Sequence, residues 1–341
     1  MTALGASRAT DGRTMQASAA SLQRVQEPVR ERLDEVTAEM WRVVATDAPM
    51  VAQMSAHLMA MRGKMFRPTL VLLASSANDR PEADAIPLGA AVELIHLATL
   101  VHDDAIDHSV LRRGMPTLNS LFSHQISVIM GDFLYSTALT SLVGVGNLGA
   151  LEALTRASTD MTIGELRQLA VVSPLEFSED DYFTLIRSKT ASLISAACEI
   201  GSLCGAKEHR ETLARFGERL GMTFQITDDL IDYTEAASTT GKPTGIDLRE
   251  HKVTLPLIAA MGSMSAPERK RVEALFAADV PDDNLIGEVI EIVKMNGGLE
   301  YARAAASRYA ALAEKTLAGL PDTVARAALI ESISYVMERH A

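Results

Sequence analysis

Two short acidic patterns are the parts of this sequence best suited to chemistry. Each consists of an aspartate pair, two further residues and a third aspartate: DDAID at 103–107 and DDLID at 228–232. On a helix, the first and last aspartates of each pattern lie one turn apart on the same face, with the second beside them. Like charges at that spacing repel, so the arrangement is unfavourable unless cations compensate it. The carboxylates are those of Asp103, Asp104, Asp107, Asp228, Asp229 and Asp232.

The residues before each pattern argue against a merely solvated surface. The runs LIHLATLV at 94–101 and FQIT at 224–227 are largely apolar. Other acidic pairs, at 180–181 and 282–283, lack such runs and are expected in solvent or at helix N-termini, where the helix dipole favours carboxylates. Each DDxxD pattern is therefore predicted to end a buried helix.

Carboxylates alone favour a hard cation such as Mg²⁺, which bridges one or two of them to substrate phosphates. Zinc would require histidine or cysteine ligands at metal spacing. Glu93 and His96 form one ExxH, half of a di-iron motif, but no second ExxH stands on an apolar helix. The sequence thus predicts magnesium rather than zinc or iron.

Basic residues cluster beside glycine and proline, at expected helix ends and loops. Arginine forks suit diphosphate oxygens, and lysine supplies point charge. Two carboxylate clusters and two basic groups suggest two diphosphates, one held through Mg²⁺ and one held directly. The basic residues are Lys64, Arg67, Arg112, Arg113, Lys189, Lys242 and Lys252.

The elements that position these residues are predicted to be helices. Apolar residues recur at helical spacing, as in Val36–Met40–Val43–Val44, and strand alternation is almost absent. Glycine and proline mark the breaks, and Ser178 with Asp181 predicts a capping box that opens a helix. We expect an all-α, single-domain bundle of roughly a dozen helices over residues 21–341, and a flexible tail over 1–20.

Composition limits the function classes. The 341 residues carry a formal net charge of −12, which disfavours binding to nucleic acid. Two cysteines cannot build a disulfide scaffold, and no apolar run approaches the length of a membrane span. Asp11 and the lack of an amphipathic stripe disfavour a transit peptide in the tail. A soluble cytoplasmic protein is expected.

From about residue 25 to 340, the chain resembles the trans-prenyl diphosphate synthases of the polyprenyl synthetase family. The resemblance rests on both aspartate patterns and on several ordered motifs, with one departure: Arg62 replaces the first glycine of the usual GGKxxRP. It implies an isoprenoid synthase fold around a central cavity. The further motifs are GKMFRP, ELIH, LRRGMPT, GELRQ, KTASL, FQITDD and GKPTGIDLREHKVTLPL.

The resemblance also implies roles for individual residues. Asp103, Asp107 and Asp228 would hold Mg²⁺, up to three ions, against an allylic diphosphate, supported by the other three aspartates. That diphosphate would also meet Arg112, Lys189, Lys242 and, as a weaker assignment, Lys252. Thr190 and Gln225 would face the developing allylic cation. Isopentenyl diphosphate would be held by Lys64, Arg67, His96 and Arg113.

The implied reaction is ionisation, condensation and loss of a proton. In the family that the chain resembles, short-chain enzymes carry bulky residues four and five positions before the first motif, and bacterial ones have a four-residue spacer. By that resemblance, the small Ala98 and Thr99 and the two-residue spacer in DDAID imply a long-chain product of about thirty to fifty carbons, at roughly one isoprene unit per helical turn. Leu154, with Leu151, is expected near the tunnel floor. Such a product would serve as a quinone side chain.

By the same resemblance we expect a homodimer, with the apolar segment 127–139 as an interface, and peripheral membrane contact during product release. Three alternatives remain open. They are a short-chain synthase making farnesyl or geranylgeranyl diphosphate, a class I terpene cyclase and a non-catalytic partner subunit. The second DDxxD disfavours the cyclase, and six retained aspartates disfavour the partner subunit.

Overall fold

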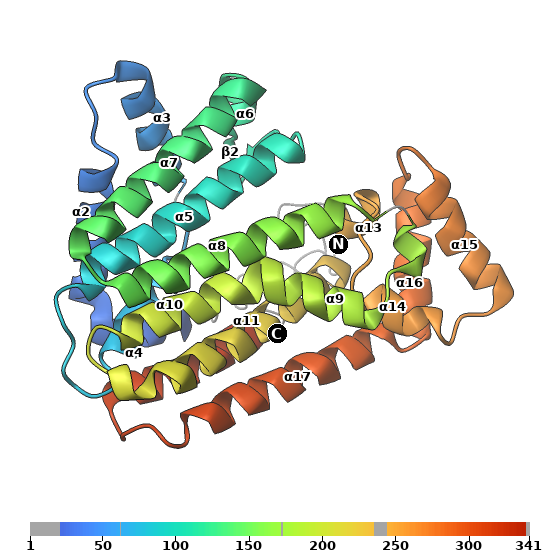
Figure 1. Ribbon diagram of the computed structural model, residues 1–341. Coiled ribbons are helices and arrows are strands. Elements are labelled where there is room, and N and C mark those ends of the chain that lie inside the picture. The colour runs from blue at the N-terminus through green and yellow to red at the C-terminus, as the bar shows by residue number, and fades with distance from the viewer. Residues whose placement is uncertain (1–20, 62, 172, 235–243, 339–341) are drawn as a thin grey trace, which may run out of the picture.

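The computed structural model describes residues 21–61, 63–171, 173–234 and 244–338, and most of them are helical. The predicted all-α fold is confirmed (Figure 1). The predicted flexible tail and Lys242 lie outside the described residues.

Long helices running side by side form the body of the molecule (Figure 1). They are α5 (Ala85–Ile106), α8 (Leu148–Leu169), α10 (Ser192–Ser202), α11 (Arg210–Thr234) and α17 (Gly298–Leu317). Helix α11 packs against α10 on one side and α17 on another, so it lies at the centre.

The remaining elements surround this body. Along the chain they are η1 (Glu27–Val29), α2 (Arg30–Val43), α3 (Pro49–Ala60), α4 (Phe66–Ser75), α6 (Leu118–Leu121), α7 (His124–Val145), η2 (Pro174–Glu176), α9 (Glu179–Ile186), η3 (Arg187–Ala191), η4 (Lys207–His209), α13 (Ile246–Arg249), α14 (Leu255–Met261), α15 (Ala266–Ala277), α16 (Asp283–Met295) and α18 (Val324–Met337).

A small hairpin follows the first aspartate pattern. Strand β1 (Leu111–Arg112) pairs antiparallel with β2 (Met115–Pro116). The two residues between them, Arg113 and Gly114, have φ angles of 52° and 76°. Left-handed backbone at both central positions is what a two-residue turn of this kind requires. The turn therefore projects from the end of α5, and Arg113 occupies it.

The hydrophobic core has two parts that meet along α11. Leu213, Phe216 and Leu220 belong to a cluster with α4, α5, α8 and α10. Further along the helix, Ile226 and Leu230 belong to a second cluster with α9, α14, α16 and α17. The second aspartate pattern lies on this later part of α11.

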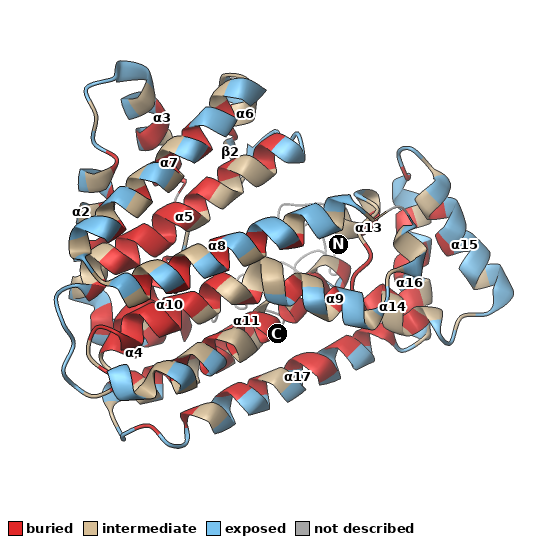
Figure 2. Ribbon diagram, viewed as in Figure 1, coloured by how far each residue is buried: buried red, intermediate tan, exposed pale blue. Residues whose placement is uncertain are grey.

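Two helices, α5 and α7, are long and apolar enough to cross a membrane by length and composition alone. In α5, 67% of the most apolar window is buried inside the bundle, as expected of a core helix. In α7 the corresponding share is 28%, and Figure 2 shows exposed stretches along it. The apolar surface of α7 is therefore less covered by the described part of the chain than that of α5.

Candidate active site

The first aspartate pattern lies at the C-terminal end of α5. The amide of Asp107 donates to the carbonyl oxygen of Asp103 at 2.8 Å, which closes the last turn. Asp104 is buried, and both of its carboxylate oxygens accept from Nε of Arg112 at 2.9 Å. Asp107 is exposed, 3.9 Å from Nζ of Lys252. The predicted pattern thus does end a buried helix, with cations beside two of its three carboxylates.

The second pattern lies in the last turns of α11, where a chain of hydrogen bonds surrounds Asp229. The buried Asp229 accepts from the hydroxyl of Tyr182 at 2.5 Å and from Nε2 of Gln225 at 2.8 Å. The Gln225 carbonyl in turn accepts from the hydroxyl of Thr190 at 2.7 Å. Neutral donors therefore fix this carboxylate, and the network brings the predicted Thr190 and Gln225 together.

Asp232 organises the segment that follows. Its two carboxylate oxygens accept from the amides of Ile246 and Asp247, at 2.9 and 3.0 Å. Its carbonyl accepts from the amide of Gly245 at 2.9 Å. The third aspartate of this pattern consequently anchors the start of α13 to α11.

Lys189 and Thr190 belong to η3, a single π-helical turn between α9 and α10. Such wide turns are rare and occur frequently at functional sites. Gly221 on α11 allows the close approach, because a Cβ there would lie 2.5 Å from the Cα of Ala191. A side chain at 221 would therefore push η3 away and separate Thr190 from Gln225, one turn further along α11.

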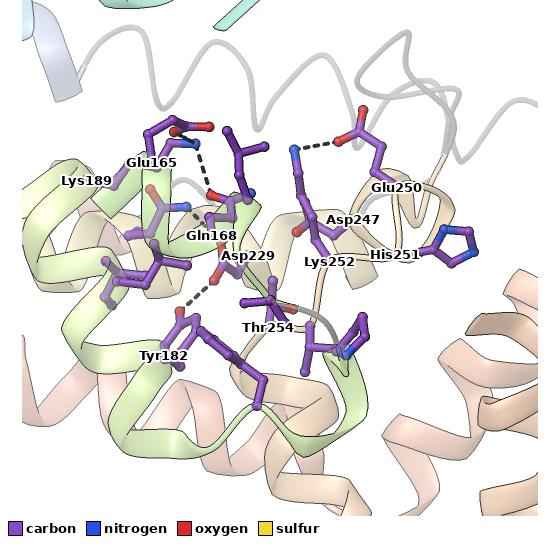
Figure 3. A pocket seen from close by; sticks show the side chains of 18 of the residues that line it. Glu165, Gln168, Tyr182, Lys189, Asp229, Asp247, Glu250, His251, Lys252 and Thr254 are labelled. Atoms are coloured by element: carbon purple, nitrogen blue, oxygen red, sulfur yellow. Dashed lines mark hydrogen bonds and ion pairs between the residues drawn. The ribbon is translucent and has the colours of Figure 1, made fainter. Parts of the chain in front are cut away.

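The ammonium of Lys189 is held by α8. It lies 2.5 Å from a carboxylate oxygen of Glu165 and donates to the side-chain carbonyl of Gln168 at 3.0 Å. In Figure 3 this group lies on one side of the pocket, and Lys252 with Glu250, an ion pair at 2.6 Å, lies on the other.

A cavity of about 610 Å³ separates these groups. Its polar wall includes Asp107, Lys189, Asp229, Asp247 and Lys252, and its apolar wall comes largely from α8, α9 and the segment leading to α14. Carboxylates from both aspartate patterns thus line one space, together with cations from two different elements.

Burial disfavours ionisation of these carboxylates. It raises the pKa of Asp103 to about 6, an effect that Lys189 opposes and that Glu165 and Asp107 reinforce. Burial also raises the pKa of Asp229 and of Asp232, and both are raised further by Asp228. The cluster therefore holds more negative charge than its surroundings readily stabilise, and a divalent cation would relieve this.

Among the described residues, no three histidine, cysteine or acidic side chains converge closely enough to hold a metal by themselves. The predicted set of Asp103, Asp107 and Asp228 is therefore not a preformed three-ligand cage. Magnesium fits such a site, because it usually takes one or two carboxylates and completes its shell with water and substrate phosphate.

Three of the four predicted isopentenyl-binding residues, Arg67, His96 and Arg113, lie near one another, and Lys64 lies just before the helix that carries Arg67. Lys64 and Arg67 flank the start of α4, His96 lies on α5, and Arg113 lies in the hairpin turn. Nζ of Lys64 lies 5.6 Å from the centre of the Tyr335 ring. Burial lowers the pKa of His96 well below its usual value, and Arg67, Arg113 and Arg112 lower it further. His96 is therefore neutral at pH 7, beside a cluster of arginines.

The predicted chain-length residues lie in or against the core. Ala98 and Leu154 are fully buried in the same hydrophobic cluster. Thr99 is half-buried, and its hydroxyl donates to the carbonyl of His96 at 2.8 Å.

Several residues of the site were not assigned a role from the sequence. Glu165 and Gln168 lie within GELRQ, and Asp247 and Glu250 lie within GKPTGIDLREHK, so the motifs themselves were the available signal. Tyr182 does not lie in any of these motifs. Its contact with Asp229 depends on how α9 packs against α11.

Comparison with known proteins agrees with this geometry. The family model described as Polyprenyl synthetase matches residues 48–293. Over 298 residues the chain is 36% identical to the all-trans-nonaprenyl-diphosphate synthase (geranyl-diphosphate specific) of Rhodobacter capsulatus, covering 87% of this chain and 91% of that protein. It is 34% identical over 321 residues to the octaprenyl diphosphate synthase of Escherichia coli K12, covering 94% and 99%.

A solved structure shows the same arrangement of the backbone. The polyprenyl synthase of Caulobacter crescentus CB15, complexed with calcium and isoprenyl diphosphate, matches with a TM-score of 0.89 at 32% identity, covering 94% of this chain and 98% of that one. At this identity and coverage, the likeness extends over almost the whole fold.

Proposed function

This chain belongs to the polyprenyl synthetase family of prenyltransferases, and on that premise we propose that it extends an allylic diphosphate with isopentenyl diphosphate to a long-chain all-trans polyprenyl diphosphate. The observation that carries the proposal is that Asp107 and Asp229, one from each aspartate pattern, line one cavity, while a separate cluster of basic residues lies near His96. One reactant would be held through metal and the other directly.

Asp103, Asp107 and Asp228 would hold Mg²⁺, up to three ions with the substrate bound. When bound, the metal would neutralise charge on the departing diphosphate. Asp104, Asp229 and Asp232 act in support, because their carboxylate oxygens already accept hydrogen bonds from the protein. The donors include Arg112 for Asp104, Tyr182 for Asp229 and the Ile246 amide for Asp232.

The cations would bind the allylic diphosphate directly. Arg112 and Lys252 already lie beside aspartates of the first pattern, and Lys189 is paired with Glu165. Lys242 is proposed to join them. Once the allylic C–O bond ionises, the oxygens of Thr190 and Gln225 would face the positive carbon skeleton. Their mutual hydrogen bond holds these oxygens in place before the substrate arrives.

The second reactant would bind at Lys64, Arg67, His96 and Arg113. Because His96 is neutral, it would position the isopentenyl diphosphate by donating a hydrogen bond, while the arginines supply charge. The double bond of this substrate would then attack the allylic cation, and a proton would leave to the released diphosphate. The apolar wall of the cavity would exclude water, which otherwise quenches the cation.

The product is proposed to be about thirty to fifty carbons long, at roughly one isoprene unit per helical turn of tunnel. The small side chain of Ala98, with Thr99, would leave the tunnel open along α5, and Leu154 would lie near its floor. The names of the similar nonaprenyl and octaprenyl synthases support this length and a role as a quinone side-chain precursor.

A homodimer is proposed to cover α7 and α8. Ile129 and Val143 on α7 are 66% and 62% exposed, and Leu166 on α8 is 62% exposed. Figure 2 shows exposed stretches on both helices. A second copy of the chain would remove this apolar surface from water. A cytoplasmic location, with peripheral membrane contact as the product leaves, completes the proposal.

The test is a product analysis. Purified protein is incubated with farnesyl diphosphate, labelled isopentenyl diphosphate and Mg²⁺, and the dephosphorylated products are sized by chromatography. A narrow distribution beyond geranylgeranyl length supports the long-chain assignment. A stop at geranylgeranyl would assign the chain to the short-chain class. Absence of any condensation would favour a partner subunit.

Ala98→Phe should shorten the product, because a phenyl ring at this fully buried position would block the space along α5. Ala98→Val should give an intermediate length, which separates a graded steric stop from general damage. Overpacking is expected to cost about 1–3 kcal/mol of stability, so thermal melting accompanies the assay. An unchanged product length in both variants would mean that the tunnel runs elsewhere.

A further inference from the structure

Glu93 is a buried carboxylate with no role in the mechanism above. It is only 3% exposed, and its Oε2 has no hydrogen-bond partner among the described residues. Leaving a buried carboxylate oxygen unsatisfied costs more than burying an apolar group of the same size. The presence of a carboxylate on this otherwise apolar stretch of α5 therefore needs a physical explanation.

The position of Glu93 points to the arginines beside His96. It precedes His96 by three residues on α5, so both side chains lie on one face of the helix. Helix α4, which carries Arg67, packs against α5. Burial raises the pKa of Glu93, and Arg67 and Arg113 are the charges that oppose this rise.

The two arginines come from different elements of the fold. Nη1 of Arg113 donates to the carbonyl of Met61 at 2.8 Å. Its guanidinium lies against Gly63, where a Cβ would fall 2.5 Å from Nη2. Arg67 comes from α4, and its buried Nε has no hydrogen-bond partner among the described residues. Two guanidiniums so placed repel each other, and the charge of Glu93 offsets that repulsion.

Glu199 shows what a purely structural carboxylate looks like in the same fold. It is also buried, on α10, and it also faces two arginines. Its oxygens accept directly from Arg156 at 2.6 Å and from Arg210 at 2.7 and 2.9 Å. These bonds pair the Glu199 carboxylate directly with both guanidiniums. By contrast, no hydrogen bond joins Glu93 to Arg67 or Arg113 in the described structure, so Glu93 occupies none of their N–H donors.

We propose that Glu93 is a positioning residue that holds Arg67 and Arg113 in one orientation for the diphosphate of isopentenyl diphosphate. This inference rests on the proposed function. The carboxylate of Glu93 keeps two like charges together, so that both guanidinium forks face the same anion when it binds.

Glu93→Gln tests the inference, because glutamine keeps the shape and removes the charge. The expected result is a rise of about tenfold or more in KM for isopentenyl diphosphate, with KM for the allylic diphosphate changed less than about twofold. Glu93→Asp, which keeps the charge, should fall between the wild type and Glu93→Gln. Direct binding of isopentenyl diphosphate, measured by calorimetry without the second substrate, should weaken in the same order.

Glu199→Gln is the matched control. It removes a buried carboxylate between two arginines outside the proposed site, so it should lower the melting temperature without a selective change in either KM. If Glu93→Gln does not fold, Glu93→Asp is compared with Glu199→Asp. The test is then whether KM for isopentenyl diphosphate rises more than KM for the allylic diphosphate in the Glu93 variant alone.

Either of two results overturns the inference: an unchanged or lower KM for isopentenyl diphosphate in the Glu93 variants, or equal rises in both KM values. Failure of the proposed function has a different signature, because the wild type itself would then incorporate no isopentenyl diphosphate.

Discussion

At the end of α5, the carboxylates of the first aspartate pattern lie beside cations, whereas Asp229 and Asp232 on α11 are held by neutral hydrogen-bond donors. Arg112 pairs with Asp104, and Lys252 lies within ion-pair distance of Asp107. In the second pattern the donors are the hydroxyl of Tyr182, the amide of Gln225 and two backbone amides.

This difference suggests different behaviour when substrate binds. A cation beside a carboxylate can transfer to an incoming phosphate and leave the carboxylate free for metal. Neutral donors fix the geometry of Asp229 and Asp232 while leaving their charge in place. We therefore expect the first pattern to rearrange on binding and the second to serve as the fixed side of the site.

The largest effect is expected from Asp103→Ala and Asp228→Ala. Each removes a proposed metal ligand, so turnover should fall by roughly 10³-fold or more without unfolding the protein. The measurement is steady-state condensation at saturating Mg²⁺, with circular dichroism as a check of folding. Asp180→Ala, which alters an exposed acid in the first turn of α9, is the matched control. Near-normal turnover in either site variant would contradict the metal assignment.

The second prediction concerns pH. Burial raises the pKa of Asp103 to about 6, and Mg²⁺ binds the ionised form. The apparent affinity for Mg²⁺ should therefore fall as pH drops below about 6, by up to roughly tenfold per unit. Magnesium titrations of activity from pH 5 to 8 would measure this.

In the metal-free protein, the contribution of Asp103 to folding stability changes with pH in the opposite direction. Because the folded state binds this proton more tightly than the unfolded state does, Asp103 contributes relatively more stability as pH falls from about 6 towards its unfolded value. Asp103→Asn should flatten this contribution and serves as the control. A magnesium affinity that is constant between pH 5 and 8 would show that Asp103 does not limit metal binding.

A smaller effect is expected from Tyr182→Phe, which removes one neutral donor from Asp229. Turnover should fall about tenfold and unfolding free energy by about 1–2 kcal/mol, since a hydrogen bond to a charged group is lost. Tyr233→Phe is a matched control, because Tyr233 is also buried but its hydroxyl meets Thr254 at 3.4 Å. Equal losses in turnover for both variants would mean that Asp229 does not depend on this donor.

Local sequence signals predicted much of this architecture. The capping box of Ser178 and Asp181 opens α9 as expected, and Asp282 caps α16 by accepting from the amide of Leu285. Both aspartate patterns end long helices whose apolar residues are buried. These features depend on residues within a few positions of one another, so spacing alone was sufficient.

Other parts of the site depend on packing between distant segments, and spacing did not reveal them. The π-helical turn that carries Lys189 forms where Gly221 lets α11 approach η3 closely. Tyr182 reaches Asp229 only because α9 lies against α11. The hairpin that presents Arg113 likewise departs from the predicted all-helical pattern, and Gly114 is its local sequence signal.

The smallest effect separates the third aspartates of the two patterns. Asp232→Ala should lower unfolding free energy by about 1 kcal/mol, because the amides of Ile246 and Asp247 lose their acceptor. Relief of repulsion from Asp228 offsets part of that loss. Asp107→Ala should change stability by less than about 0.5 kcal/mol, because its carboxylate is exposed and its ion pair with Lys252 is long.

Urea unfolding of both variants measures this difference, and the condensation assay is run beside it. Asp107→Ala should lose turnover while keeping its stability, as expected of a ligand that binds metal only with substrate present. Asp232→Ala should lose both, because its carboxylate also anchors α13 to α11. Equal changes in stability would mean that the backbone amides at 246 and 247 find another acceptor, and the second pattern would then not be the fixed side of the site.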